Sequence, residues 1–369
     1  AAGRSVGIFA QSVGGGGGLV LPGGGATAVF TASGGTGDGG TVTVTNGADS
    51  IVVLGANSTA LYAQSVGGGG GAVGLATDPA GQVGAFLFSG SSGGSGAGGN
   101  TVINQTGNLV APGANSIGLV AQSSGGSGDG NITVNILSPS SASHTLIEGG
   151  SGSGAGVSLL GGATNTLNNA GIITSVLGVD GYAVRATSGD DTVNNTLLMS
   201  GSVDLGSGTN AINNAAGAIF ESGAVVAVGA GNLVSNAGLL SPGGYNNVSL
   251  TTLTGNLAQA ATGTYGADLD LQALASDRIA VSGSATFAGT VLVNLVDPLI
   301  APGYARPGTA AETLLTATQG LTTSDLNLAA FQTAVARYGL IRPDANTLSL
   351  QWAVNYAPAG LNPAETILG

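Results

Sequence analysis

A seven-residue phrase that leads into glycines occurs three times in the first third of the chain, and it constrains the fold more than any other feature. The three copies contain the pairs Gln11-Ser12, Gln64-Ser65 and Gln122-Ser123. Such repetition is typical of stacked architectures, in which each repeat buries its apolar face against its neighbours. The glutamines are 53 residues (Gln11 to Gln64) and 58 residues (Gln64 to Gln122) apart. These spacings exceed one coil of a regular solenoid, so we expect two or three coils in each repeat.

A shorter repeat follows between residues 161 and 240 and is marked by asparagines. Each copy ends an apolar segment with a pair whose second member is Asn169, Asn195, Asn214 or Asn236. The intervals are 26, 19 and 22 residues, which is about one coil of a three-sided β-solenoid. We expect the amides to hydrogen-bond from coil to coil and the asparagines to supply left-handed backbone at a corner. A metal or glycan site is the alternative, but turn chemistry explains these asparagines without a ligand.

The composition indicates a folded β protein. Glycine supplies 70 of 369 residues and charged residues only 7%, yet 43% of the residues are hydrophobic, which argues against disorder. Short β-branched segments such as Thr41–Thr45 and Thr101–Asn104 are bounded by Gly, Asn and Asp, as strands commonly are. The apolar residues are therefore expected to be buried along short strands.

The residue types that are absent exclude several kinds of chemistry. The chain has no cysteine and no lysine, and its single histidine is His144. Thiol nucleophiles, lysine Schiff bases, phosphate-loop lysines and cysteine or multi-histidine zinc sites are therefore excluded in this segment. The formal charge of −12 argues against nucleic acid and anionic lipid as partners. We expect a protein that is not an enzyme and needs no cofactor.

The sequence pattern changes after Ser241-Pro242-Gly243. Longer segments with clear apolar alternation follow, and in residues 267–271 the aspartates face one side and the leucines the other. Near the end, segments 338–342 and 347–352 flank Pro343–Asn346 and predict a hairpin. A β-rich block of this kind is what a solenoid needs at an open end, where the last coil would expose strand edges.

On these residues the chain resembles the passenger segment of autotransporters, the Gram-negative type V secretion proteins. The Ala-Gln-Ser-Val-polyglycine phrase at Gln11 and Gln64 is similar to the repeat of large autotransporter passengers. The more specific similarity is to the order of motifs in the family's C-terminal stability region, here at residues 241–243, 253–257, 263–265, 276–285 and 314–317. Residues 355–362 resemble the linker that leads into the translocator barrel.

The resemblance implies an all-β fold: a right-handed parallel β-helix, or β-solenoid, with a C-terminal β-rich cap that helps the passenger fold outside the cell. It divides the chain into passenger repeats at 1–240, with Gly-rich repeats at 1–136 and shorter Asn-Asn coils at 161–240, an autochaperone-like cap at 241–356 and the start of a linker at 357–369. It also implies an outer-membrane β-barrel beyond Gly369 as the passenger's own partner. The segment departs from the family pattern by lacking that barrel.

Asp190 and Asp191 are weak candidates for a metal or catalytic site. With Asp180 and Arg185 they form the one cluster in the solenoid that could serve a polysaccharide-cleaving enzyme. The pattern around Asp190 also resembles calcium-binding nonapeptide repeats, but those need Gly-Gly-x-Gly-x-Asp in successive copies and here it occurs once, imperfectly. A solvated turn is the favoured interpretation. The same holds for two other glycine-rich turns, which carry Asp38 and Asp129.

Other motifs have simpler explanations than a site. Ser5 and Ser92 fit the nucleophile-elbow pattern, as chance allows in a chain so rich in Gly and Ser, and His144 is the only histidine available as a base. The glycine runs lack a following lysine, so we expect flexible surface turns and not phosphate cradles. Trp352 and Tyr356 are expected to pack in the C-terminal cap.

We therefore expect a non-enzymatic surface passenger, exported through the Gram-negative outer membrane, that acts in adhesion or cell-cell contact. Rows of exposed Ser, Thr and Asn suit many weak contacts in parallel. Its partners would be glycans or proteins on host or neighbouring cells. Two alternatives stay open: a polysaccharide lyase or hydrolase that uses the cluster at 180–191, and a passive stalk that carries a module before Ala1.

Overall fold

The computed structural model describes residues 3–15, 35–47, 50–69, 71–74, 86–89, 95–140, 142–296 and 305–357, with only the backbone described at 71–74 and 86–89. These residues belong to two compact units, 1–212 and 213–369. The expected fold class is confirmed: the chain is all-β, a right-handed parallel β-helix with a C-terminal β-rich cap. Ser92, most of the glycine runs and the linker from residue 358 onward lie outside the described residues.

The first unit has three columns of stacked parallel strands, one for each face of the coil. Face A contains β1 (Val6–Val13), β4 (Thr59–Val66), β9 (Ile117–Ser124), β12 (Ala155–Gly161) and β15 (Tyr182–Ala186). Face B contains β2 (Val42–Asn46), β7 (Thr101–Gln105), β10 (Ile132–Ile136), β13 (Thr164–Asn169) and β16 (Asp190–Asn195). Face C contains β3 (Ile51–Val52), β8 (Leu109–Val110), β11 (Leu146–Gly149), β14 (Ile172–Ser175) and β17 (Leu198–Asp204).

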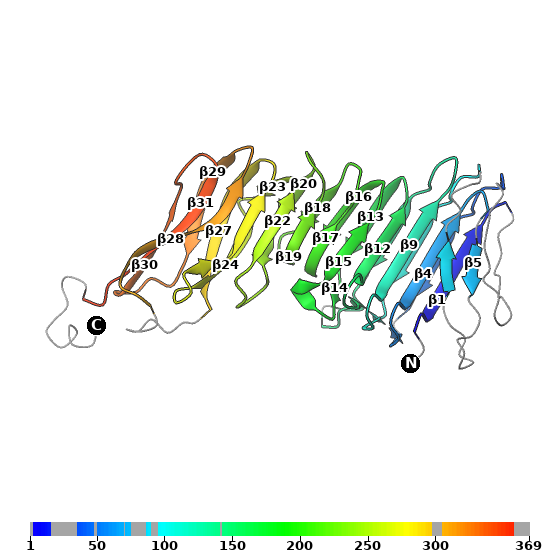
Figure 1. The fold of residues 1–369 in the computed structure, drawn as a ribbon, viewed down its shortest axis with the longest axis horizontal. Coiled ribbons are helices and arrows are strands. Elements are labelled where there is room, and N and C mark those ends of the chain that lie inside the picture. Colours follow the sequence, from blue (N-terminus) through cyan, green and yellow to red (C-terminus); the bar gives the residue numbers. More distant parts are fainter. Residues whose placement is uncertain are drawn as a thin grey trace. The chain divides into compact units, whose positions relative to one another are not determined.

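Two minor elements complete this unit. A short 3-10 helix, η1 (Gly178–Asp180), precedes β15. An antiparallel pair, β5 (Gly71–Gly74) and β6 (Phe86–Ser89), lies in the long connection between β4 and β7. In Figure 1, β4, β9, β12 and β15 lie side by side in chain order, as their pairing requires.

The strands of face B alternate between the interior and the surface, which is why β-branched and aliphatic residues occur there at every second position. On face B, Ile103, Val134, Leu167 and Val193 are in register and fully buried. Burying one such side chain stabilises a fold by roughly 1.5–3 kcal/mol. The residues between them point outward and are partly exposed. Neighbouring coils therefore supply each other's core.

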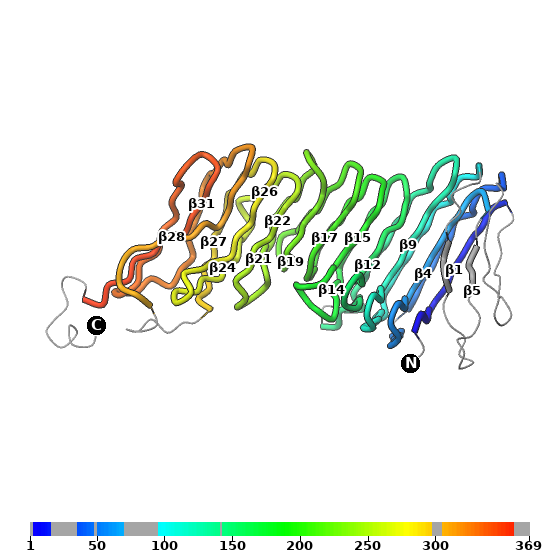
Figure 2. The backbone as a smooth tube through the Cα atoms, viewed as in Figure 1, coloured from blue at the N-terminus to red at the C-terminus, as the bar shows by residue number. Residues whose placement is uncertain are grey.

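The expectation of two or three coils in each long repeat is wrong. Gln11, Gln64 and Gln122 pair directly on successive strands of face A, and their amides hydrogen-bond in series over 2.8 Å at each step. Each repeat is therefore one coil, and its extra length lies in the connections between face A and face B. Lengthening a loop adds only slowly to its closure entropy, so a long connection can still return to the same register. Figure 2 shows β1, β4 and β9 side by side, as their direct pairing requires.

The shorter asparagine repeat is one coil long, as expected. Asn169 pairs with Asn195, and its Nδ2 donates to the Asn195 Oδ1 over 2.8 Å. In the second unit, Asn214 Nδ2 donates to Asn236 Oδ1 over 2.8 Å. These asparagines end strands and do not have left-handed backbone, so that part of the expectation is wrong. Left-handed backbone occurs instead at Asn57 and Asn115, at φ 53° and 57°, and at Asn246, at φ 62°.

The glycine that begins each long run is a packing residue, and here the expectation of flexible surface turns is wrong. Gly14 and Gly67 are buried and donate their backbone N–H to Val66 and Ser124 of the next coil, each over 2.8 Å. A Cβ at Gly67 would lie 2.0 Å from the carbonyl oxygen of Ala97. Only glycine permits this close approach of two backbones.

The second unit continues with parallel strands beyond residue 240, where the sequence pattern changes. Its parallel strands are β19 (Ile219–Ala227), β20 (Leu233–Asn236), β21 (Leu239–Pro242), β22 (Leu250–Thr254), β23 (Asn256–Gln259), β24 (Thr264–Asp270), β26 (Arg278–Val281), β27 (Ala285–Leu295), β28 (Gly308–Ala317) and β29 (Leu321–Ala329). The strand β18 (Ala211–Asn214) lies across the boundary between the units.

Antiparallel pairing closes the second unit. The predicted hairpin is confirmed, because β30 (Ala336–Ile341) pairs with β31 (Thr347–Val354). β31 also pairs antiparallel with β28, and the short β25 (Ala275–Ser276) pairs with β24. Trp352 is buried in this cap, as expected. The core beneath contains Tyr265 and Phe287 in edge-to-face contact, 5.7 Å between ring centroids.

Candidate functional site

Every strand of face B presents two outward-facing residues at equivalent positions, so these residues form two rows across the face. One row is Thr43, Val102, Thr133, Thr166 and Thr192, and the other is Thr45, Asn104, Asn135, Asn168 and Asn194. Strands of a parallel sheet lie about 4.8 Å apart, so each row repeats its groups at that interval. We call these ten residues the threonine/asparagine array. It is a regular surface of hydroxyl and amide groups.

Hydrogen bonds between neighbouring asparagines fix the second row. Asn135 Nδ2 donates to Asn104 Oδ1, and Asn168 Nδ2 donates to Asn135 Oδ1, each over 2.9 Å. Asn194 Nδ2 donates to Asn168 Oδ1 over the same distance. An amide has two N–H donors and two acceptor lone pairs, so Asn135 and Asn168 each keep one N–H and one lone pair for a ligand. The ladder orders these side chains before any partner arrives.

The array contains no charged side chain. Its groups are hydroxyls, amides and one valine, and none of them titrates in the physiological range. Such a surface suits a neutral partner that carries hydroxyl or amide groups of its own. Because the same contacts recur on each coil, binding at one coil raises the effective concentration of the partner at the next.

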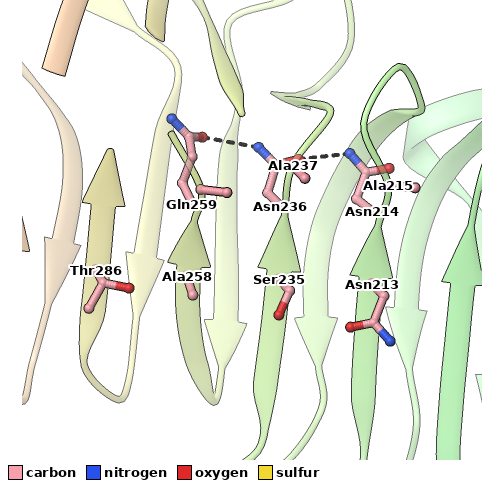
Figure 3. A pocket seen from close by; sticks show the side chains of 10 residues that line it. Asn213, Asn214, Ala215, Ser235, Asn236, Ala237, Ala258, Gln259 and Thr286 are labelled. Atoms are coloured by element: carbon pink, nitrogen blue, oxygen red, sulfur yellow. Dashed lines mark hydrogen bonds between the residues drawn. The ribbon is translucent and has the colours of Figure 1, made fainter. Parts of the chain in front are cut away.

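The second unit has an open pocket of about 410 Å³ on a similar surface (Figure 3). Its outward residues include Asn213, Ser235 and Ala258, one on each of three strands. At the ends of the strands, Asn236 Nδ2 donates to Gln259 Oε1 over 3.0 Å, and Gln259 Nε2 to the carbonyl oxygen of Ala288 over 2.8 Å. Small side chains such as Ala258 leave the surface hollowed. None of the described residues that line this pocket carries a charge.

The structure places Asp190 and Asp191 on opposite sides of β16. Asp190 Oδ1 accepts the backbone N–H of Thr209 over 2.7 Å, as a turn-fixing residue does. Asp191 is fully buried, and its Oδ1 accepts the Asn165 amide over 2.8 Å. Burial raises the pKa of the Asp191 carboxyl to about 7, the Asn165 hydrogen bond lowers it, and the charge of Asp190 raises it further. The two carboxylates do not converge on one point.

Asp191 Oδ2 and Asn165 Oδ1 are buried without a hydrogen-bond partner. Among the described residues there is no group of three His, Cys, Asp or Glu side chains that could hold a metal ion. Arg185 lies over the Tyr182 ring, 4.9 Å from its centroid, and donates to the carbonyl oxygen of Ser153. Within the described part of the chain no ion pair joins Arg185 to Asp180 or to Asp190.

The other sequence candidates occupy structural positions. Asp38 Oδ1 accepts the backbone N–H of Ala97, and Asp129 Oδ1 accepts that of Gly125, each over 2.8 Å. His144 Nδ1 lies 3.4 Å from Ser138 Oγ, but that hydroxyl donates to the carbonyl oxygen of Ala170 over 2.5 Å. These contacts hold loops together.

Ser5 and Tyr356 also make contacts within the fold. The Ser5 backbone N–H donates to the hydroxyl of Ser58 over 2.9 Å. The Tyr356 hydroxyl donates to the carbonyl oxygen of Ala305 over 2.7 Å, which ties the end of the described chain to the cap.

Sequence reasoning missed a buried pair of carboxylates in the second unit. Asp277 accepts the backbone N–H groups of Ser249 and Asp268, over 2.7 and 2.9 Å. Asp268 accepts the Asn247 backbone N–H over 2.7 Å and the Asn294 amide over 2.6 Å. Burial raises the pKa of Asp277 to about 8, although both hydrogen bonds lower it. The pair fastens the loop after β21 to the core.

Alternation alone could have placed Asp268 on the outer side of its strand but not beneath a loop. The feature that could have revealed the covering is the loop itself, where Gly243, Gly244 and Asn246 all have positive φ and fold the chain back over β24.

In the described part of the chain, no helical segment has the length and hydrophobicity needed to cross a lipid bilayer. Comparison with models of known protein families and with curated protein sequences finds no match to this chain.

Proposed function

We propose that the chain is a non-enzymatic passenger of the autotransporter type, displayed at the cell surface or released from it, that adheres to other surfaces through the threonine/asparagine array. The observation that carries the adhesive role is the repetition of identical, ordered, uncharged polar groups on successive coils. The parallel β-helix and its antiparallel C-terminal cap support the passenger assignment, together with the sequence resemblance from Ser241 onward.

Adhesion by the array would be the sum of weak contacts. A typical hydrogen bond exchanged with water contributes only about 0.5–1.5 kcal/mol, so one coil alone binds poorly. Linked contacts strengthen the whole attachment because each bound coil holds the next one near its partner. Because the array is neutral, we propose glycans or proteins that expose uncharged hydroxyl and amide groups as partners.

The experiment displays the chain on cells through an outer-membrane barrel and compares adhesion with cells that carry the barrel alone. Thr133→Lys with Thr192→Lys places two charges on the array, two coils apart. Val110→Lys with Thr174→Lys is the matched control, because these residues point outward on face C at the same separation. We expect the chain to confer adhesion, the array variant to lose most of it and the control to keep it. Equal adhesion by chain-bearing and barrel-only cells would refute the proposal.

The second part of the proposal is that the cap promotes folding of the passenger during secretion. Trp352 is 3% exposed and belongs to β31, which pairs with both β28 and β30. Trp352→Ala is therefore expected to reduce the amount of protease-resistant passenger at the surface, including its first unit. If the first unit remained protease-resistant at wild-type levels, the cap would not have this role.

A further inference from the structure

The second unit contains an open groove of about 770 Å³ whose walls combine aromatic rings with amide groups. Tyr245 and Asn246 come from the loop after β21, Asn294 from the end of β27, Phe331 from the segment after β29, and Tyr338 from β30. A volume of this size is within the range of small-molecule sites. Nothing in the proposed adhesive array involves these residues.

Two aromatic side chains in this groove are unusually exposed. Phe331 is 78% exposed and Tyr245 is 74% exposed, although most large apolar side chains of the described chain are buried. Leaving aromatic rings in water forfeits the stabilisation that burial would give them. Two such rings lining one concavity mark a binding surface, since scattered exposed residues would need no explanation but a shared patch does.

The polar groups of the groove are held in place and partly unused. Asn294 Nδ2 donates to Asn246 Oδ1 over 2.8 Å and to Asp268 Oδ1 over 2.6 Å. Within the described part of the chain this leaves Asn294 Oδ1 as a free acceptor and Asn246 Nδ2 as a free donor. Asn246 has left-handed backbone, at φ 62°, and its loop is fastened by the buried Asp268 and Asp277. The amides are therefore preorganised for a ligand.

Tyr338 provides a second, independent indication of a ligand. Its side chain lines the groove and is only 9% exposed, and its hydroxyl oxygen is buried without a hydrogen-bond partner. Buried hydroxyl groups are nearly always paired, so an unpaired one calls for an explanation. A bound molecule with a hydroxyl group would supply the missing partner once the ring turned to open this oxygen to the groove.

The carboxylate near the groove and the lack of basic side chains in its described lining disfavour anionic ligands. No basic side chain is among the described residues that line the groove, and the carboxylate of Asp268 lies directly behind the amide of Asn294. A purely apolar ligand would leave the two amides and the Tyr338 hydroxyl unpaired, which is unfavourable. A neutral sugar ring satisfies both conditions, because its C–H face can stack on the electron-rich face of an aromatic ring while its hydroxyls meet the amides.

We propose that this groove binds a neutral saccharide, stacked on Phe331 and Tyr245 and hydrogen-bonded by Asn246, Asn294 and the Tyr338 hydroxyl. In taking the ligand to be a cell-surface glycan, the inference rests on the proposed function. Binding of the sugar itself does not depend on it.

The experiment uses the purified full chain and three probes: neutral hexose and N-acetylhexosamine oligosaccharides, the same glycans with sialic acid or sulfate, and an apolar fluorescent dye. We expect calorimetric binding of at least one neutral glycan and at least about tenfold weaker binding of its charged counterpart. Preference for the charged glycans, or binding of the dye with no neutral glycan bound, would overturn the inference.

Variants test the residues. Phe331→Ala and Tyr245→Ala should each weaken sugar binding by about tenfold or more, while Leu54→Ala, an exposed apolar residue of the first unit, should leave it unchanged. Tyr338→Phe should weaken binding without lowering the melting temperature, because the hydroxyl it removes is unpaired in the free protein. Wild-type sugar binding by all three groove variants would refute the site.

The two proposals can fail separately. A Phe331→Ala chain that no longer binds sugar but still confers adhesion would leave the array's role standing. An array variant that no longer adheres but binds sugar normally would leave the groove's role standing.

Discussion

The array of the first unit and the groove of the second unit are built in opposite ways. The array repeats one pair of positions on successive coils, and its asparagines hydrogen-bond to copies of themselves. The groove is assembled from residues that occur once, and a pair of buried aspartates fastens the loop that forms part of it, whereas the described strands of the array carry a single buried aspartate, Asp191. Repetition gives a regular surface for many weak contacts, whereas departure from repetition gathers unlike side chains around one groove.

The largest expected effect is a pH dependence that originates in the second unit. The pKa of Asp277 is raised from 3.8 to about 8, so between these values the folded chain holds a proton that the unfolded chain has lost. The stability that protonated Asp277 contributes is therefore full below about pH 4 and is lost as the pH rises towards 8, a fall of about 2–5 kcal/mol. Asp191, raised to about 7, adds a smaller fall that ends earlier.

Urea unfolding between pH 4 and 9 measures this fall. Asp277→Asn should remove most of it, and Asp191→Asn the smaller part from the first unit. An unchanged pH profile in Asp277→Asn would show that the buried pair does not hold the proton. The main pH dependence of stability would then not originate in the second unit.

The next largest expected effect is the loss of stability when a glycine of the Gly-rich repeat, compared with a glycine of the cap, is replaced by alanine. Gly67→Ala forces a methyl group to within 2.0 Å of the Ala97 carbonyl oxygen and should lower the free energy of unfolding by about 1–3 kcal/mol. Gly339→Ala, in the cap strand β30, meets no atom within 4 Å and should change it by less than about 0.5 kcal/mol. Equal effects in chemical denaturation would mean that the glycines of the repeat do not fix the coil corner.

Substitutions of two neighbouring asparagines distinguish the buried ladder of the scaffold from the outer ladder of the array. Asn169→Ala removes a buried amide that accepts the Gly171 N–H and donates to Asn195, so it should destabilise the chain by about 1–3 kcal/mol. Asn168→Ala removes a partly exposed amide of the outer row and should cost under about 1 kcal/mol. Thermal unfolding of the two variants measures the difference, and a reversed order would contradict the assignment of inner and outer ladders.

The smallest expected effect is on stability when the array is changed. Thr133→Lys and Thr192→Lys replace outward side chains that are not part of the core, so each should alter the free energy of unfolding by less than about 0.5 kcal/mol. Circular dichroism melts of the array variant and of the face C control should coincide with the wild type. A large loss in the array variant alone would mean that its adhesion result reports misfolding.

The sequence predicted those parts of the structure that follow from local repetition. The asparagine intervals indicated one coil each and stacked amides, and the spacing around Pro343 indicated the hairpin of β30 and β31. Coil length in the Gly-rich repeats was mispredicted because their spacings of 53 and 58 residues exceed a regular coil, and the repeated phrase does not show that the excess lies in one long connection. The register of Gln11, Gln64 and Gln122 is visible only once the strands are paired.

The groove and the carboxylate pair could not be predicted for a different reason. Tyr245 and Phe331 are brought together by the stacking of several strands between them, and nothing in either local sequence refers to the other. Alternation placed Asp268 on one side of its strand, but alternation does not show that a loop will cover it or that Asp277 will be buried beside it. Features that form where distant segments of the chain meet are visible only in the folded structure.

The most direct test of adhesion through a repeated face is to count the coils that contribute. Cells that display the chain with one, two or three of Thr133→Lys, Thr166→Lys and Thr192→Lys are compared by the force needed to detach them, with face C variants as controls. We expect a stepwise loss of detachment force that grows with each substituted coil, and no loss in the controls. Complete loss from one array position with no further effect of the others would indicate a single site, and undiminished force in the triple variant would show that the array does not adhere.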